Sequence, residues 1–400
     1  MIHELENVIQ AYAWGSHSAL AQLRGAPHPT PAPEAELWMG AHPLAPSRLK
    51  ASGLTLAASI AAAPAEHLGP QVQQAYGPKL PFLLKVLAAG TPLSLQAHPS
   101  IEQARQGFAA DEAAGIALDA PYRNYKDQNH KPELICALGE FWALCGFRPV
   151  PRTLELLAEL GLPELAAYGA LLADEPHQVG ISKAFSALMQ APAEQARALA
   201  QVTTAACREK HASSARFAHE LRWVARLGEL YPGDIGVVSS LLLNLVRLEA
   251  DEAVYLPAGN LHAYLGGTGV ELMASSDNVL RGGLTPKHVN VPELLRVLDF
   301  RPLEVEPLRA VTHGSEHTYA TPAREFCLSY FECSPGSASI EVTLAGPEIW
   351  LVTQGTLTLG AAQAPSLTLR AGRSAFVSAA TGQLTLSGEG RIFRARVASV

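Results

Sequence analysis

The sequence contains few cysteines and no arrangement that would pair them. There are five, an odd number, scattered with no C-x-x-C pair among them: Cys136, Cys145, Cys207, Cys327 and Cys333. This distribution argues against a disulfide framework of the kind found in small secreted proteins. We therefore expect reduced, partly buried thiols in a cytoplasmic protein.

Long hydrophobic runs are also absent. The sequence has no stretch of about 18 apolar residues, the length that a membrane-spanning helix needs. The N-terminal residues, MIHELENVIQAYAWGS, lack the basic segment followed by an apolar core that marks a secretory signal. We expect neither a membrane span nor a signal peptide, which agrees with a cytoplasmic location.

Basic residues are in the minority. The 30 Lys and Arg residues against 37 Asp and Glu residues give a formal net charge of -7. A general nucleic-acid binder needs a basic surface that displaces counterions, so this balance argues against that class. A small anionic substrate remains compatible, because a local cluster of Lys and Arg can act inside an acidic protein.

The length and the distribution of residue types predict several domains. A chain of 400 residues exceeds the usual size of one hydrophobic core. Short apolar runs broken by Gly and Pro predict strands before residue 150, whereas residues 151–230 have apolar residues at helical spacing. After Gly236 the pattern returns to strands, and from about residue 320 one short strand follows another.

We therefore predict a mainly β protein with a helical insertion. Residues 1–150 and 236–315 would form one β domain, and residues 151–235 an all-helical domain inserted into it. Residues 316–400 would form a separate, smaller β domain at the C-terminus.

Four residues have the chemistry of a metal site. Gln96 and His98 lie two apart in SLQAHP, so on a strand their side chains would point to the same face. Glu133 lies at the start of an apparent strand, and His262 follows a Pro-Gly turn. Two imidazoles, a carboxylate and an amide oxygen suit zinc, whose catalytic sites keep one position open for water or substrate.

Two longer runs concentrate polar side chains of different types. The first is YKDQNHKPE, from Tyr125 to Glu133, beside an apolar strand. The second, from His262 to Lys287, contains several glycines that allow close backbone approach. This second run supplies the polar residues Glu271, Asp277, Asn278, Arg281 and Lys287. The combination indicates the wall of an active site.

Both runs resemble those of the type I mannose-6-phosphate isomerases, a family of zinc enzymes. The similarity extends to AYAWGS near the N-terminus, to ELWMGAHP at 36–43 and to LPFLLKVLAAGTPLSLQAHP. It covers roughly residues 1–300 well, whereas the tail matches only in its β character. The resemblance implies interconversion of mannose 6-phosphate and fructose 6-phosphate through an enediolate, with one zinc ion per chain.

The resemblance also implies roles for individual residues. Carried over by position, the zinc ligands of the family fall on the four residues already proposed: Gln96, His98, Glu133 and His262. The catalytic arginine falls on Arg281, and Ser94, Lys131, Glu271 and Asp277 match residues that line the active site. The family usually has Ala after the arginine, where this chain has Gly282.

The fold that the resemblance implies is cupin-like, a β jelly roll with a metal inside. LPAGNLHA, which ends near His262, resembles the second cupin motif. LRAGRSAFVSA in the tail resembles it without a histidine, and no histidine follows residue 320. The C-terminal domain is therefore predicted to be a cupin-like module without metal. Separately, we expect the protein to be a monomer.

The expected mechanism leaves the general base open. Arg281 would stabilise developing negative charge, since a guanidinium stays protonated. Lys131, Glu271 and Asp277 are candidates for acid–base work, and the sequence does not choose among them. Residues that could hold the substrate phosphate are Ser94, Lys85, Lys131, Arg281 and Lys287.

Two other functional classes use similar residues. Another cupin metalloenzyme, such as an iron dioxygenase or a different sugar-phosphate isomerase, would share the ligand types. A non-catalytic sugar-binding cupin would have lost a ligand or Arg281, and all of these are present.

Overall fold

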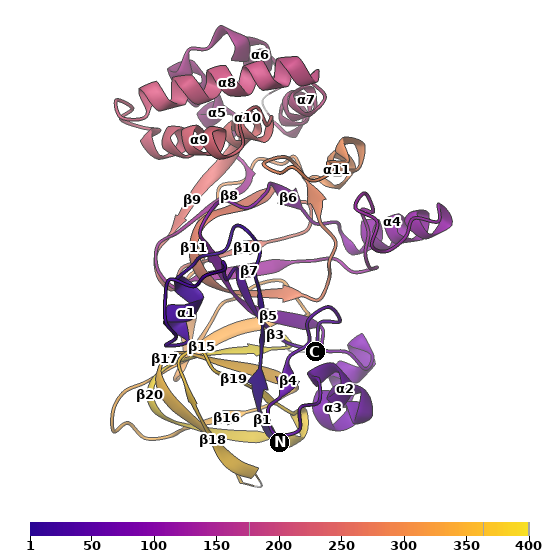
Figure 1. Ribbon diagram of the computed structural model, residues 1–400, viewed down its shortest axis with the longest axis vertical. Coiled ribbons are helices and arrows are strands. Elements are labelled where there is room, and N and C mark those ends of the chain that lie inside the picture. The colour runs from indigo at the N-terminus through magenta and orange to yellow at the C-terminus, as the bar shows by residue number, and fades with distance from the viewer. Residues whose placement is uncertain (176, 363, 399–400) are drawn as a thin grey trace.

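The computed structural model describes residues 1–175, 177–362 and 364–398. Figure 1 shows an elongated molecule with a helical bundle at one end, a central β region, and a second β region at the other end, near both termini. The predicted architecture, mainly β with a helical insertion, is confirmed.

The central sheet is organised around one long strand, β11. Its main path runs β10-β7-β11-β5-β3-β2. The bounds of these strands are β2 Val8–Gln10, β3 Glu36–Met39, β5 Phe82–Ala89, β7 Glu133–Ala137, β10 Ala253–Leu256 and β11 His262–Ala274. The second half of β11 pairs with β5 and β7, while its first half pairs with β6 (Gln96–Ala97) and β8 (Phe141–Phe147). A single strand thus contributes to two layers of a cupin-like sandwich.

The change of partners along β11 depends on Gly267. The register against β8 shifts between Tyr264 and Gly266. Gly267 has a φ of 118°, and a Cβ there would lie 2.6 Å from the carbonyl oxygen of Glu140. Only glycine fits this bend. Two short extensions complete the layer that the first half of β11 forms: β9 (Leu243–Leu248) pairs with β8, and β12 (Leu280–Arg281) pairs with β6.

The helical insertion forms as predicted, with one correction at its end. Its helices are α5 Val150–Leu160, α6 Ala166–Asp174, α7 Gln178–Met189, α8 Ala193–Lys210, α9 Ala218–Leu230 and α10 Gly236–Ser239, with 3-10 turns at Pro163–Leu165 and Ser240–Leu242. The expectation that strands resume directly after Gly236 was wrong, because β9 begins only at Leu243. The Asp234 carboxylate accepts a hydrogen bond from the Gly236 N–H (2.7 Å) and starts a helical turn. A short buried apolar run does not by itself distinguish strand from helix.

The C-terminal sheet contains strands from both ends of the chain. Its main path runs β13-β14-β15-β20-β17-β19-β1-β4, with β16 and β18 at its side. The bounds are β1 Ile2–Glu6, β4 Arg48–Leu49, β13 Val311–His313, β14 Glu316–Thr318, β15 Cys327–Cys333, β16 Ile340–Thr343, β17 Glu348–Ala361, β18 Ala364–Arg370, β19 Ser374–Val377 and β20 Gln383–Arg396. The N-terminal strand β1 pairs with β19, far away in the sequence. The domain limits at residues 150, 235 and 315 remain predictions.

Buried side chains join the three regions. One hydrophobic cluster includes Phe185 and Leu221 of the helical insertion together with Leu95 and Leu261 near β6 and β11. Another includes Val86 of the central sheet and Phe376 of the C-terminal sheet. Shorter helices lie around the β regions: α1 Ala19–Leu23, α2 Leu56–Ala62, α3 Pro64–Tyr76, α4 Ile101–Ala113 and α11 Val291–Val297.

The five cysteines are all free thiols, and every one except the half-buried Cys327 is buried. This confirms the prediction of reduced, partly buried thiols. In the part of the chain that the structure describes, no helix combines the length and the apolar character that crossing a bilayer requires.

A pair of histidines, His67 buried and His3 half-buried, connects α3 to the C-terminal sheet. The His67 ring nitrogens lie 2.9 Å from Ser59 Oγ and 2.8 Å from Ser378 Oγ. The His3 ring lies 6.2 Å from that of His67. Burial lowers the pKa of both histidines, and the proximity of His67 lowers the pKa of His3 further.

We predict that part of the acid sensitivity of the protein comes from this pair. A histidine whose folded-state pKa is below its unfolded value of about 6.5 binds more protons when unfolded. Its neutral form is accommodated without penalty above pH about 6.5, and stability is lost as the pH falls below that value. Denaturant unfolding of wild type and His67→Gln between pH 8 and pH 5 should show a smaller loss in the variant. Parallel pH profiles would contradict this origin.

Candidate metal and active site

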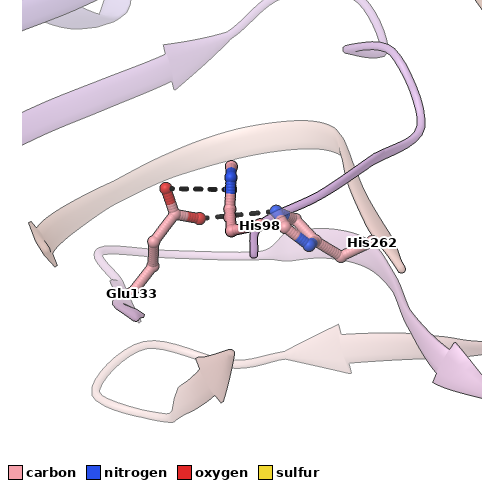
Figure 2. A group of neighbouring side chains, drawn as sticks. All are labelled: His98, Glu133 and His262. Carbon is pink, nitrogen blue, oxygen red and sulfur yellow. Dashed lines mark ion pairs between the residues drawn. The ribbon is translucent and has the colours of Figure 1, made fainter. Parts of the chain in front are cut away.

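Three side chains from distant parts of the sequence meet inside the central sheet. His98, Glu133 and His262 are all buried, and each offers a ligand atom within 4.8 Å of the others. His98 Nε2 lies 3.4 Å from Glu133 Oε1, and His262 Nε2 lies 3.4 Å from Glu133 Oε2. Figure 2 shows both imidazoles turned toward the same carboxylate.

Hydrogen bonds fix the protonation of both imidazoles. His98 Nδ1 lies 2.7 Å from the carbonyl oxygen of Asn278, and His262 Nδ1 lies 3.0 Å from that of Asn260. A carbonyl oxygen only accepts, so each Nδ1 carries a proton, and in the neutral ring Nε2 is the atom that presents a lone pair. Burial lowers the pKa of His98 to about 4, which keeps that ring neutral.

The arrangement is suited to a cation. Within the described residues, His98 Nε2, His262 Nε2 and Glu133 Oε2 are buried atoms with no hydrogen-bond partner. Lone pairs of two neutral imidazoles that face a carboxylate repel it unless a positive ion lies among them. Nitrogen and oxygen donors of this kind fit zinc. The residues present therefore fit the metal that the sequence predicts.

Local sequence explains how these three residues arrive at one place. β7 begins at Glu133, and β11 begins at His262, as the sequence predicts. Gly259 has a φ of 77°, and a Cβ there would lie 3.0 Å from the Val297 carbonyl oxygen, so the turn before β11 requires glycine. The Gly259 N–H donates to the His98 carbonyl oxygen (2.8 Å) and ties the two histidine segments together.

Gln96 and Arg281 share a row with His262. In β6, Gln96 lies directly opposite His262 of β11 on one side and opposite Arg281 of β12 on the other. Directly opposed residues of antiparallel strands project to the same face. His98 lies one residue beyond the end of β6. The structure thus places Gln96 next to the three-residue cluster, and its role as a fourth ligand remains a prediction.

Lys131 belongs to the same cluster. Its Nζ lies 2.6 Å from Glu133 Oε1, and both side chains are buried. Burial alone raises the pKa of a carboxyl group, but the charge of Lys131 holds the pKa of Glu133 well below its usual range. Glu133 is therefore ionised, with one oxygen on Lys131 and the other facing His262.

Glu271 lies in a buried ion triad, a feature that the sequence did not indicate. Lys85 Nζ is 3.1 Å from Glu271 Oε2 and 3.3 Å from Glu36 Oε1. Burial lowers the pKa of Lys85, but the charges of Glu271 and Glu36 outweigh that effect and raise it. Burial also raises the pKa of Glu271. Because two carboxylates already contact the single positive charge of Lys85, the geometry does not favour Lys85 as a phosphate ligand.

Asp277 is held by a residue whose role the sequence did not reveal. His42 Nε2 lies 3.3 Å from Asp277 Oδ1. His42 Nδ1 accepts the Leu44 N–H (3.3 Å), so Nε2 carries the proton and donates to Asp277. Burial by itself raises the pKa of Asp277, but the hydrogen bond from His42 contributes to holding it below the usual value. Asp277 is 38% exposed and thus more accessible than Glu271 or Glu133.

Ser94, Arg281 and Lys287 form a separate group. Arg281 Nη1 donates to Ser94 Oγ (2.9 Å). Burial lowers the pKa of Arg281, and the nearby Arg281 charge lowers the pKa of the exposed Lys287. The structure thus brings together three of the five residues that the sequence suggested for the substrate phosphate. Glu36 and His42 both lie in ELWMGAHP, a segment that resembles the family, but nothing in the segment itself indicates their partners.

The unusual Gly282 is compatible with a well-ordered loop. Its N–H donates to the Leu95 carbonyl oxygen (2.8 Å), and its backbone conformation is accessible to any residue. A Cβ there would lie 3.1 Å from Leu261 Cδ1, a flexible side-chain end. Gly283 differs, with a φ of 113° and a Cβ position only 2.8 Å from Gly236 Cα.

We predict opposite outcomes for alanine at these two neighbouring glycines. Gly282→Ala should change the free energy of unfolding by less than about 1 kcal/mol, because a less flexible unfolded chain offsets the small rearrangement of Leu261. Gly283→Ala should cost at least about 1–3 kcal/mol, since the backbone becomes strained. Denaturant unfolding of both variants tests this. Equal losses would mean that space, and not backbone conformation, limits both positions.

The fold and the cluster together define a class of protein. A cupin-like sandwich that holds two neutral imidazoles and an ionised carboxylate around one point is a metalloprotein architecture. The comparisons with known proteins give the family. Residues 2–150 match the family described as phosphomannose isomerase type I, catalytic domain. The mannose-6-phosphate isomerase of Shigella flexneri is 39% identical over 401 residues, covering 98% of this chain and 99% of that protein.

More distant relatives and solved structures agree. The human mannose-6-phosphate isomerase is 34% identical over 391 residues, covering 89% of this chain and 88% of its own. A zinc-bound mannose 6-phosphate isomerase has a TM-score of 0.91 at 36% identity and full coverage of both chains. The apo form from Salmonella typhimurium has a TM-score of 0.90 at 36% identity, covering 100% of this chain and 99% of that one. The chain belongs to the type I phosphomannose isomerase family.

Proposed function

We propose that this protein is a zinc-dependent isomerase that interconverts mannose 6-phosphate and fructose 6-phosphate. The observation that carries the proposal is the convergence of His98 Nε2, His262 Nε2 and Glu133 Oε2, three buried atoms without partners among the described residues. Full-length relatives named mannose-6-phosphate isomerase, and the zinc in one solved structure, support the same reaction and metal.

The metal would be held by His98, Glu133 and His262, with Gln96 as the fourth ligand. When bound, zinc supplies a Lewis acid that polarises a sugar oxygen. Lys131 would hold one oxygen of Glu133, which leaves the other oxygen for the ion. The carbonyl groups of Asn278 and Asn260 keep the two imidazoles in the tautomer that a ligand requires.

Isomerisation moves a proton from C2 of the aldose to C1 through an enediolate, and we assign the proton transfer to Asp277. Glu271 is fully buried, and its charge is matched by Lys85. Lys131 is engaged by Glu133. Asp277 combines partial exposure with a pKa held low in part by the His42 hydrogen bond, so it is ionised and can reach a substrate. An ionised, accessible carboxylate is the state that a general base requires.

Arg281 would stabilise the negative charge that develops on the enediolate. It stays protonated, and its hydrogen bond to Ser94 orients the guanidinium. Lys287 lies near enough for the Arg281 charge to lower its pKa. Two cations and a hydroxyl would also suit the substrate phosphate. Ser94 and Lys287 are therefore proposed to bind substrate. A cytoplasmic location and a monomeric state remain predictions.

A coupled assay tests the reaction and the metal together. Purified protein loaded with zinc should convert mannose 6-phosphate to fructose 6-phosphate, lose turnover with a chelator and regain it when zinc is returned. Asp277→Asn should lower kcat by about 100-fold or more while zinc affinity is retained, as expected for loss of a general base. Absence of turnover in folded, zinc-loaded protein would refute the proposed reaction. Normal turnover of Asp277→Asn would remove only the assignment of the base.

A further inference from the structure

We infer that Asp127 is a positioning residue that fixes the geometry of the metal ligand His98 and of Asp277 without touching either side chain. The inference rests on the proposed function of the site. Asp127 lies in the loop before β7, four residues before Lys131, and is half-buried. Its carboxylate joins this loop to the loop between β11 and β12.

The Asp127 carboxylate accepts hydrogen bonds from both loops. On the far loop it accepts the Ser276 hydroxyl (2.9 and 3.1 Å) and the Asp277 N–H (2.8 Å). It also accepts the Asn278 side-chain amide (3.3 Å), and on its own loop the Asn129 N–H (2.9 Å). A carboxylate with this many donors is well satisfied and restricts every residue that donates to it.

Asn278 transmits this restraint to the metal ligand. It is fully buried, and its side-chain amide both accepts from and donates to backbone groups of the loop that contains Asp127. Its Oδ1 accepts the Lys126 N–H (2.7 Å), and its Nδ2 donates to the carbonyl oxygens of Asp127 (2.8 Å) and Asn129 (2.9 Å). The backbone carbonyl of the same residue accepts the His98 Nδ1–H (2.7 Å). The position of that carbonyl sets the tautomer and orientation of the His98 ring.

The two loops carry most of the reacting groups. Lys131 and Glu133 follow Asp127, whereas Asp277 and Arg281 lie in or directly after the far loop. Loss of the carboxylate would release the Asp277 N–H and remove its bonds to the Asn278 amide and to Ser276, whose hydroxyl accepts the Asn278 N–H, and would thereby loosen the Asn278 carbonyl. Zinc affinity and turnover should therefore both change, although Asp127 contacts no ligand atom of the site. Such coupled loss distinguishes positioning from a merely structural role.

Asp127→Asn, which keeps the shape and removes the charge, is the main test. Its amide cannot accept all the hydrogen bonds that the carboxylate accepts, and one face would present an N–H against another donor. The control is Asp119→Asn, which makes the same charge change at an exposed position eight residues earlier. Zinc affinity is measured by competition with a chromophoric chelator, in parallel with kcat, KM and the melting temperature of the zinc-free protein.

Zinc affinity of Asp127→Asn should fall by roughly 10–100-fold, as for other residues that orient a metal ligand. At saturating zinc, kcat should stay below that of the wild type because Asp277 is no longer held. Asp119→Asn should match the wild type in both. Wild-type zinc affinity in Asp127→Asn, with or without a lower melting temperature, would overturn the inference. The zinc measurement needs no turnover, so it stands apart from a failure of the proposed reaction.

Discussion

Replacement of His262 by alanine should abolish zinc binding and isomerase turnover while the fold is retained. The imidazole supplies one of the three buried ligand atoms that converge on the proposed ion. The two that remain, from His98 and Glu133, are too few to hold zinc in its usual coordination. The loss of zinc affinity should exceed the roughly 10–100-fold that follows when only a supporting residue is removed. His262 must therefore show a larger effect than Asp127.

The variant must be separated from a simple loss of stability. His262 is 1% exposed and its Nδ1 donates to the Asn260 carbonyl oxygen, so truncation leaves a small cavity and one unpaired acceptor. We expect a cost of about 1–3 kcal/mol in the zinc-free protein. Chelator competition, circular dichroism and the coupled assay should be applied together. His313→Ala, at an exposed histidine, is the matched control. Zinc affinity equal to that of the control would exclude His262 as a ligand.

The sequence indicates the individual residues of the site but not the contacts that orient them. Glu133 and His262 lie at strand starts, which local patterns reveal, and the glycine at 259 marks the turn before β11. A similarity of motifs then suffices to propose which residues meet. The hydrogen bond of His42 to Asp277 joins positions more than 200 residues apart, and nothing local in the sequence specifies it.

The same limit applies to the fold. Helical periodicity predicts the insertion because the signal is repeated over many turns. Residues 236–242 carry only a short apolar run, and their helical turns depend on the Asp234 side chain. The pairing of β1 with β19 has no local signal, because register in a sheet is set by the partner strand and the shared core. The predicted domain limits assign residues 1–150 to the central β domain, so they do not include the pairing of β1 with the C-terminal sheet.

Replacement of Lys85 by methionine should destabilise the protein by about 3–5 kcal/mol, the usual cost of removing one partner from a buried ion group. Methionine has nearly the length of lysine, so packing is largely kept. What is lost is the ammonium that contacts both Glu36 and Glu271, two buried carboxylates that would then lack a counter-charge. Lys50→Met, which breaks the exposed pair with Glu4, should cost no more than about 1 kcal/mol.

The pH dependence of this loss identifies its electrostatic origin. Burial raises the pKa of Glu271 even with Lys85 present, and removal of the lysine raises it further. A carboxyl group whose folded-state pKa is above its unfolded value of about 4.3 destabilises the protein above that folded pKa, and the penalty fades as the pH falls. The deficit of Lys85→Met relative to wild type should therefore shrink from pH 8 to pH 5. Adding Glu271→Gln should recover much of it at pH 8, because one buried charge disappears. A deficit that is independent of pH and unchanged in the double variant would mean that Lys85→Met destabilises the protein through packing. The charges of the triad would then not be the source of its contribution to stability.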